Sequence, residues 1–282
     1  MKINISTLSA LAVFAATALV AQAQQPVVLN DIVVGFRPGP SGGGTTNLEV
    51  KAGSVSTLAG YTTETLIGNF NTSLNGVSSV WASSTTGSTL VQWGAIGSAS
   101  SSNVFATAVW DNTTPGTLGV ANPYNGITWS GLASGSVANA AVAISTMENG
   151  FNGIHATLTG DGKSITIGKS DTQSWTTAGG TGSSAFGAFT NNNGFSQNAT
   201  RFATDGSSSL AFSAADLYSV SAGSSTFLGT FALYTGSYNG HSIGDLTFTA
   251  SAIPEPSTYA AILGLASLGF VMIRRRQKAS AV

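Results

Sequence analysis

Apolar and polar residues alternate in many short runs along the middle of the chain, and Gly, Asn, Ser and Pro separate these runs. Such alternation with a period of two is typical of half-buried β-strands. The runs Thr226–Tyr234 and Asp245–Ala250 each place three apolar side chains on one face of a predicted strand. These are Phe227, Phe231 and Leu233 in the first run and Leu246, Phe248 and Ala250 in the second.

The segment Gly153–Gly168 predicts a β-hairpin. Asp161-Gly162 is a strong two-residue turn signal. Folding about this turn places apolar residues opposite apolar residues and hydroxyls opposite hydroxyls, and a slip of one residue would destroy the match. The register pairs Thr159 with Ser164, Leu158 with Ile165, Thr157 with Thr166, and Ala156 with Ile167.

One segment, Val137–Asn149, follows a helical period instead. Ser136 is a suitable N-cap, and Gly150 is expected to end the helix. The apolar residues fall roughly on one stripe, as a helix packed on a sheet requires. They are Val137, Ala140, Ala141, Ile144 and Met147.

Together these elements predict one all-β domain over residues 24–251, a β-sandwich or a jelly-roll-like fold. The Gly, Ser, Thr and Asn content leaves a β-solenoid as the alternative. Only 7% of the 282 residues are charged, and there is no cysteine. Packing rather than disulfides must therefore stabilise the domain, and the shortage of charge leaves strand edges open to self-association.

The amino-terminal residues predict a secretory signal peptide over residues 1–23. Lys2 precedes an almost unbroken apolar run, Leu8–Val20. Ala21 and Ala23 fit the small-x-small pattern of signal peptidase, so that Gln24 becomes the first residue after cleavage. The alternative is a retained amino-terminal membrane helix, which the short run makes less favourable.

The carboxyl-terminal residues predict a second apolar segment, Tyr259–Ile273, which has fifteen residues and no charge. A helix of this length spans about 22 Å, whereas the hydrocarbon core of a bilayer is about 30 Å thick. The basic residues Arg274, Arg275 and Arg276 follow it, and Lys278 lies nearby. By the positive-inside rule residues 274–282 stay in the cytoplasm, so the body lies on the opposite side, as the signal peptide also requires.

Between body and apolar run, residues 252–258 form a linker that contains Pro254 and Pro256. The residue before a proline avoids the α region, so Ile253 and Glu255 are expected to be extended. An extended peptide beside a membrane is a suitable substrate for a membrane-embedded protease. From these residues alone, a plain single-pass anchor with a proline-containing linker is an equally good interpretation.

The carboxyl-terminal segment resembles the PEP-CTERM sorting signal. It consists of Ile253-Pro254-Glu255-Pro256-Ser257-Thr258, then the apolar run, then Arg274–Arg276. Ile253 stands where valine is commoner. The resemblance implies a Gram-negative exporter, processing by an exosortase near Pro-Glu-Pro, and delivery to the surface or to extracellular polysaccharide. Four body segments are also similar to secreted PEP-CTERM proteins of unknown activity. They are Asp31–Arg37, Asn47–Gly53, Leu90–Gly97, and Asp216–Val220 with Phe227–Phe231.

Few residues in the body suggest chemistry. His155 is expected to face solvent from the hairpin, and His241 follows Asn239-Gly240 in a predicted turn. With only two histidines and no cysteine, we expect no zinc site and no cofactor. A carboxylate pair for glycoside hydrolysis stays open, although no spacing selects two members. The candidates are Asp111, Glu148, Asp171, Asp205, Asp216 and Asp245.

The five tryptophans, Trp81, Trp93, Trp110, Trp129 and Trp175, have two interpretations. They are suited to stacking on sugar rings, but in a charge-poor β-domain we expect at least three to be buried. Without both ends the chain has ten acidic and five basic residues, a net charge of about −5. This balance argues against nucleic acid as a partner.

The sequence therefore predicts an exported envelope or matrix protein without catalytic activity. Its expected partners are signal peptidase, an exosortase, and the bilayer that Tyr259–Ile273 enters. The main alternative is a carbohydrate-binding or polysaccharide-modifying surface protein, with exopolysaccharide as its ligand. A third hypothesis is a structural or adhesive protein that assembles through sheet edges.

Overall fold

The computed structural model describes the body of the chain, with gaps. The described residues are 25–39, 43–79, 81, 91–110, 116–123, 133–153, 157–158, 162–178, 202–204 and 210–251. The predicted signal peptide, linker, membrane helix and basic tail all lie outside them.

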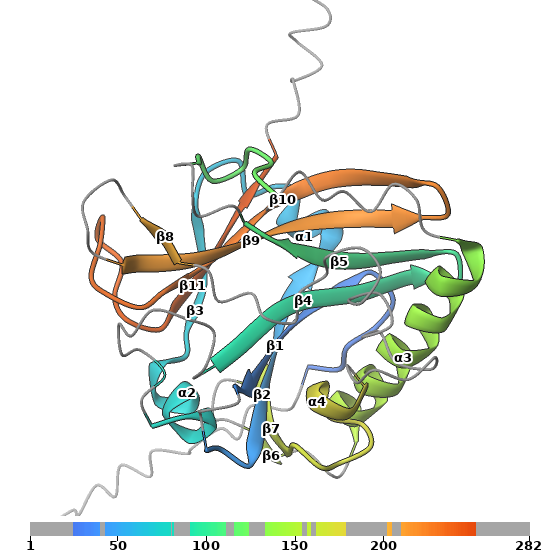
Figure 1. The fold of residues 1–282 in the computed structure, drawn as a ribbon, viewed down its shortest axis with the longest axis horizontal. Coiled ribbons are helices and arrows are strands. Elements are labelled where there is room, and N and C mark those ends of the chain that lie inside the picture. Colours follow the sequence, from blue (N-terminus) through green and yellow to red (C-terminus); the bar gives the residue numbers. More distant parts are fainter. Residues whose placement is uncertain are drawn as a thin grey trace, which may run out of the picture.

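Eleven strands and four helices make up the described part (Figure 1). The strands are β1 (Asp31–Pro38), β2 (Thr46–Ser54), β3 (Thr65–Asn69), β4 (Val91–Ser100), β5 (Asn103–Val109), β6 (Thr157–Leu158), β7 (Ser164–Gly168), β8 (Phe202–Thr204), β9 (Leu210–Ser221), β10 (Ser224–Tyr234) and β11 (Asp245–Ala250). The helices are α1 (Val55–Leu58), α2 (Asn71–Val77), α3 (Ser134–Asn152) and α4 (Trp175–Ala178).

All eleven strands belong to one antiparallel sheet. Its order is β3-β11-β10-β9-β5-β4-β1-β2-β7-β6, and β8 pairs with β9 beside this path. The predicted all-β class is confirmed for the described residues, but the two sheets of a sandwich or jelly roll are not formed there. The pairing of β5 with β9 and of β4 with β1 continues the sheet where a sandwich would divide. A β-solenoid is excluded for these strands because its ladders are parallel.

The sheet curls around one apolar core, and we call the face that bears this core the inner face. Leu48 and Val50 of β2 belong to the same buried cluster as Leu246 and Phe248 of β11, although five strands separate β2 from β11. Short helix α1 follows β2 directly and contacts β11, so it lies between the two approaching parts of the sheet. The predicted inner positions of β11, namely Leu246, Phe248 and Ala250, are confirmed.

One expected face is wrong. Phe231 and Leu233 of β10 lie in the inner cluster, but Phe227 packs with the residues of the opposite face. The ladder between β10 and β9 shifts between Phe227 and Gly229, which inserts one extra residue, Leu228. A bulge of this kind reverses the alternation on one side of it.

The outer face is covered by α3 and α4. Helix α3 packs on β4 and β5, and Trp175 of α4 lies over Gly35 and Gly94, which are opposite each other in the β1–β4 ladder (Figure 1). A Cβ at Gly35 would overlap the indole ring of Trp175. These glycines therefore provide the flat surface that the buried indole requires.

The predicted helix is present but longer than expected. Its stripe of five apolar residues is buried, as predicted. However, the helix begins at Ser134, after the N-cap residue Ala133, so Ser136 lies inside it. Gly150 does not end the helix, because it is the point where the helix meets Gln173, and a Cβ there would collide with that residue. The C-cap is Gly153.

The hairpin register is confirmed where the structure describes it. Thr157 pairs with Thr166 and Leu158 with Ile165, as the alternation predicts. Gly162 has a φ of 66°, which suits its position in the turn. His155 lies outside the described residues, and so does one member of each of the other two predicted pairs.

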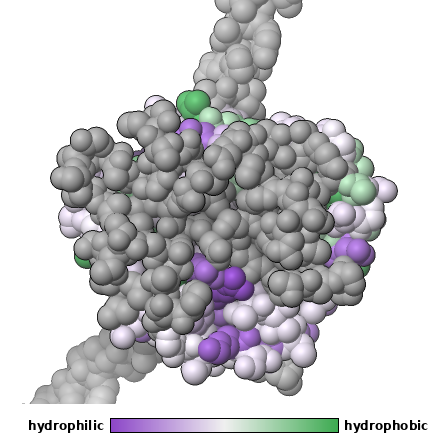
Figure 2. All heavy atoms as spheres, viewed as in Figure 1, coloured by the Kyte–Doolittle hydropathy of each residue, from purple (hydrophilic) through white to green (hydrophobic). Residues whose placement is uncertain are grey.

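The described surface reflects the low charge of the chain. In the view of Figure 2 most described atoms are pale, of intermediate hydropathy, with a few hydrophilic groups and small apolar patches at the margins. No helix in the described ranges is both long and apolar enough to cross a membrane.

Candidate functional site

The described body ends at Ser251, immediately before the predicted sorting segment. Ile253, Pro254, Glu255, Pro256, Ser257 and Thr258 all lie outside the described residues, as do Arg274–Arg276, Ala21 and Ala23. The described part that borders the sorting segment is the end of β11.

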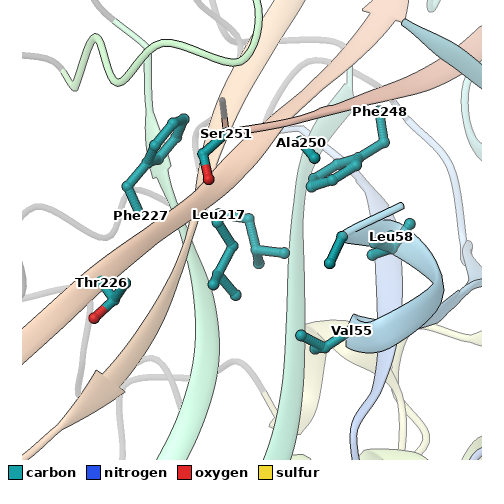
Figure 3. A pocket seen from close by; sticks show the side chains of 10 residues that line it. Val55, Leu58, Leu217, Thr226, Phe227, Phe248, Ala250 and Ser251 are labelled. Atoms are coloured by element: carbon teal, nitrogen blue, oxygen red, sulfur yellow. The ribbon is translucent and has the colours of Figure 1, made fainter. Parts of the chain in front are cut away.

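An apolar pocket of about 300 Å³ lies at this end of the sheet (Figure 3). Val55 and Leu58 of α1 face Leu217 and Phe248 of the sheet across it. Its other wall comes from the start of β10 and the end of β11, and consists of Thr226, Phe227, Leu228, Ala250 and Ser251. The pocket is thus an opening of the inner core at the place where the described chain ends.

The backbone at this wall is well defined by two hydrogen bonds. Ser251 N–H donates to the Leu228 carbonyl at 2.9 Å, so the ladder to β10 continues one residue beyond β11. Ala250 N–H points the other way and donates to the Tyr61 carbonyl at 2.8 Å. The root of the sorting segment is therefore held between β10 and the segment that follows α1.

A polar cluster lies on the outer face of β10 and β11. Glu64 Oε1 accepts hydrogen bonds from the hydroxyls of Tyr234, at 2.6 Å, and Thr247, at 2.7 Å. Burial and the hydrogen bond to Glu64 raise the pKa of Tyr234, so this hydroxyl remains a donor. The cluster ties Glu64, just before edge strand β3, to the two neighbouring strands.

His241 lies in the turn that the sequence predicts. Asn239 and Gly240 have φ values of 47° and 85°, as a tight hairpin turn requires. The imidazole stacks on Tyr234 at a centroid distance of 4.3 Å and lies between Glu64 and Asp245, at 3.5 and 3.6 Å. Within the described ranges no three histidine, aspartate or glutamate side chains are arranged so that they could hold a metal ion.

Of the six carboxylates considered for glycoside hydrolysis, Asp111 and Asp205 lie outside the described residues. Three of the other four have separate structural partners. Asp216 accepts from Asn122 N–H and the Thr230 hydroxyl, and Asp245 from Asn69 and Ser242 N–H. Asp171 accepts from Gln173 N–H. Glu148 is buried on α3.

Burial changes the proton affinity of two of these groups. It raises the pKa of Asp216 to about 7, although two hydrogen bonds act in the opposite direction. Burial, and to a smaller extent the charge of Asp31, raise the pKa of Glu148 to about 7. Asp31 itself forms an ion pair with Lys51 at 2.8 Å.

Glu49 is not among the candidates that the sequence indicates, although it is a fully buried carboxyl group with a raised pKa. Its Oε1 accepts from Trp175 N–H at 2.7 Å, and its Oε2 has no hydrogen-bond partner among the described residues. Burial raises the pKa of Glu49 to about 8, so the group is largely protonated at neutral pH. The alternation of Leu48, Glu49 and Val50 does place Glu49 on the outer face, but α4, which covers it, comes from a distant part of the sequence.

Four of the five tryptophans are buried, which confirms the prediction for at least three. Trp81, Trp93, Trp110 and Trp175 are each at most 4% exposed. Side chains buried to this degree do not offer a ring face to a sugar. Trp129 lies outside the described residues.

Comparison with known proteins identifies one segment. The family model of the PEP-CTERM protein-sorting motif matches residues 252–276. The match begins directly after Ser251 and includes Pro254-Glu255-Pro256, the apolar run and the three arginines. No curated protein and no solved structure matches the chain. The chain thus ends in a PEP-CTERM protein-sorting motif, which implies a secreted, membrane-anchored precursor that is targeted to an exosortase.

Proposed function

We propose that this chain is an envelope or extracellular-matrix protein of a Gram-negative bacterium, and that its carboxyl-terminal segment is a temporary membrane anchor. The single observation that carries the proposal is the match of residues 252–276 to the sorting motif. In this proposal signal peptidase cuts after Ala23, and Tyr259–Ile273 holds the precursor in the bilayer. An exosortase then cuts near Pro254-Glu255-Pro256.

The proposal assigns no catalytic step to the body. Its role is to be delivered to the surface or matrix and to act there by binding or by its structure. The described tryptophans do not support the carbohydrate-binding alternative, because all of them are buried. Assembly through sheet edges fits the 7% charge content, since charged side chains normally protect such edges.

Mass spectrometry of the protein released from cells tests the processing step. We expect a chain that begins at Gln24 and lacks the residues after the Pro-Glu-Pro region. A variant with alanine at Pro254, Glu255 and Pro256 should accumulate in the membrane with Arg274–Val282 intact. A matched control with lysine at Arg274, Arg275 and Arg276 keeps the charge and should be processed.

Released wild-type protein that still carried Arg274–Val282 would show that processing does not occur. The orientation is tested separately with a reporter fused after Val282. We expect this reporter in the cytoplasm, because the basic residues next to the apolar run favour that side. A reporter found outside the cell would contradict the proposed topology.

A further inference from the structure

The apolar pocket between α1 and the sheet has walls that are fixed by hydrogen bonds. Ser54 caps the start of α1, and the segment after α1 is held by the bond from Ala250 N–H to the Tyr61 carbonyl, at 2.8 Å. The ends of β10 and β11 are joined by the bond from Ser251 N–H to the Leu228 carbonyl, at 2.9 Å. Closing the pocket by moving either wall would break such bonds, so a space of about 300 Å³ stays open in the folded body.

A β-bulge in β10 gives one wall its shape. The ladder to β9 takes in an extra residue, Leu228, and the next residue, Gly229, has a φ of 152°. Only glycine adopts this conformation readily, and a Cβ there would overlap the Thr249 carbonyl oxygen. The consecutive residues Phe227 and Leu228 therefore both line the pocket, whereas in a regular strand one of them would point to the other face. Bulges are common beside functional sites, where they redirect side chains in this way.

The lining of the pocket is almost entirely apolar. Its hydroxyl groups are those of Thr226 and Ser251 (Figure 3), and none of the described lining residues is charged. Thr226 is exposed and Ser251 is half-buried, so both lie toward the mouth. A buried water molecule needs about two to four polar partners, which these two hydroxyls cannot supply in the depth of the pocket. The pocket is therefore suited to an apolar group.

The size of the pocket limits the ligand. An apolar cavity of about 150 Å³ takes up benzene, so a space twice as large accommodates roughly ten to twelve non-hydrogen atoms. Sites for small molecules begin at about this size. A flexible alkyl chain can follow a wall that combines Val55 and Leu58 with the rings of Phe227 and Phe248, whereas a fused ring system needs a flat slot.

We propose that this pocket binds the alkyl chain, roughly eight to ten carbons long, of a small neutral amphiphile. The chain lies between α1 and the bulged wall, and the head group lies at the mouth beside Thr226 and Ser251. A hydroxyl or ester head fits these hydroxyls, whereas a carboxylate would find no cation among the described lining residues. The site belongs to the folded body, so it goes beyond the proposed function and does not depend on export or cleavage.

Thiol labelling of the full-length chain in lipid nanodiscs tests the site, because the chain contains no cysteine. Leu58→Cys places one thiol in the pocket wall, where the side chain is 2% exposed. Val142→Cys places the control thiol on α3, at a position that is 62% exposed. Each variant is treated with octyl and with methyl methanethiosulfonate. Both reagents transfer an alkylthio group to the thiolate and release methanesulfinate, so they differ only in the length of the alkyl chain.

We expect the ratio of the octyl rate to the methyl rate to be roughly tenfold higher for Leu58→Cys than for Val142→Cys, because the pocket buries the octyl chain. The ratio removes the effect of burial on the reactivity of the thiol itself. Added 1-octanol should slow the labelling of Leu58→Cys but not that of Val142→Cys, and octanoate should slow it less. Equal ratios for the two variants, without protection by 1-octanol, would overturn the proposal.

A substitution at the mouth distinguishes the pocket from a merely apolar surface. Ala59 is exposed and lines the pocket, so Ala59→Trp added to Leu58→Cys should cover the mouth and lower the octyl preference to the control value. Ala59→Ser is the matched control and should keep the preference. A preference that survives Ala59→Trp would place the reaction outside the pocket. A folded Leu58→Cys variant that reacts with neither reagent would show that another part of the chain fills the pocket, and either result would overturn the proposal.

Discussion

Both faces of the curled sheet bury apolar clusters, but they differ in their buried carboxyl groups. The inner face is lined almost entirely by apolar side chains, and Ser213, a polar exception, accepts a hydrogen bond from Trp93 Nε1 at 2.6 Å. The outer face carries buried carboxyl groups on three strands, namely Glu49, Asp216 and Asp245. A different segment covers each of them: α4, residues 116–123, and the turn that contains His241.

Because of this difference, the apolar clusters and the carboxyl groups should affect the stability of the body in different ways. Apolar burial is largely independent of pH, so the inner face should hold the fold together under all conditions that an exported protein meets. Buried carboxyl groups respond to pH through their protons. We therefore expect changes among the inner apolar side chains to alter global stability at every pH, and changes at the outer carboxyl groups and their partners to alter its dependence on pH or the local order of an edge.

The largest effect is expected from Phe231→Ala. Phe231 is fully buried on the inner face, with its ring centroid 4.6 Å from that of Phe248. Removing the ring leaves a cavity and should lower the free energy of unfolding by about 3–5 kcal/mol. Urea unfolding of the purified full-length chain, followed by tryptophan fluorescence, measures this change.

Phe227→Ala is the matched control, because Phe227 lies on the same strand but is only partly buried on the outer face. We expect this substitution to lower the free energy of unfolding by about 1 kcal/mol. Equal losses for the two variants would mean that the inner face does not dominate the stability of the body.

The sequence predicted local features of this fold and missed the distant ones. The hairpin register was correct because Thr157–Leu158 and Ser164–Gly168 are joined by a short turn, and any slip would mix apolar with hydroxyl residues. The buried apolar stripe of α3 is predicted correctly because it depends only on the spacing of residues within one helix. Both predictions depend on neighbours within about twenty residues.

The errors concern contacts between distant residues. No local signal shows that β5 pairs with β9, about 110 residues later, although this pairing turns an expected sandwich into one sheet. The sequence pattern predicts a helix end at Gly150, whereas the fold needs this glycine for close approach to Gln173, which lies in another segment. Glu49 was overlooked because its burial depends on α4. The sorting motif was identified because it is contiguous in sequence.

The second prediction concerns pH. In the folded body burial raises the pKa values of Glu49, Glu148 and Asp216 to about 8, 7 and 7, from ordinary values of 4.5, 4.5 and 3.8. Between about pH 4.5 and 8 the folded state therefore binds more protons than the unfolded state. The stabilisation by these groups should therefore be complete below about pH 4 and should fall as the pH rises to 8.

Glu49→Gln isolates the largest of these contributions. Glutamine can still accept from Trp175 N–H but carries no charge, so the loss between pH 5 and 8 should shrink by about 1–4 kcal/mol. Glu49→Asp keeps the ionisable group and should retain the pH dependence, although it shortens the reach to Trp175. Urea unfolding at several pH values measures both. A wild-type body more stable at pH 8 than at pH 5 would contradict the burial of these carboxyl groups.

The smallest effect is expected from His241→Gln on the outer face. The imidazole is partly exposed, and pairs of this kind contribute about 0–1 kcal/mol. The substitution removes the stack on Tyr234 and the contacts with Glu64 and Asp245, but Glu64 keeps its hydrogen bonds to Tyr234 and Thr247. We expect faster amide hydrogen exchange in β3, next to Glu64, with global stability almost unchanged. A global loss as large as that of Phe231→Ala would show that the outer cluster, and not only the inner core, holds the sheet together.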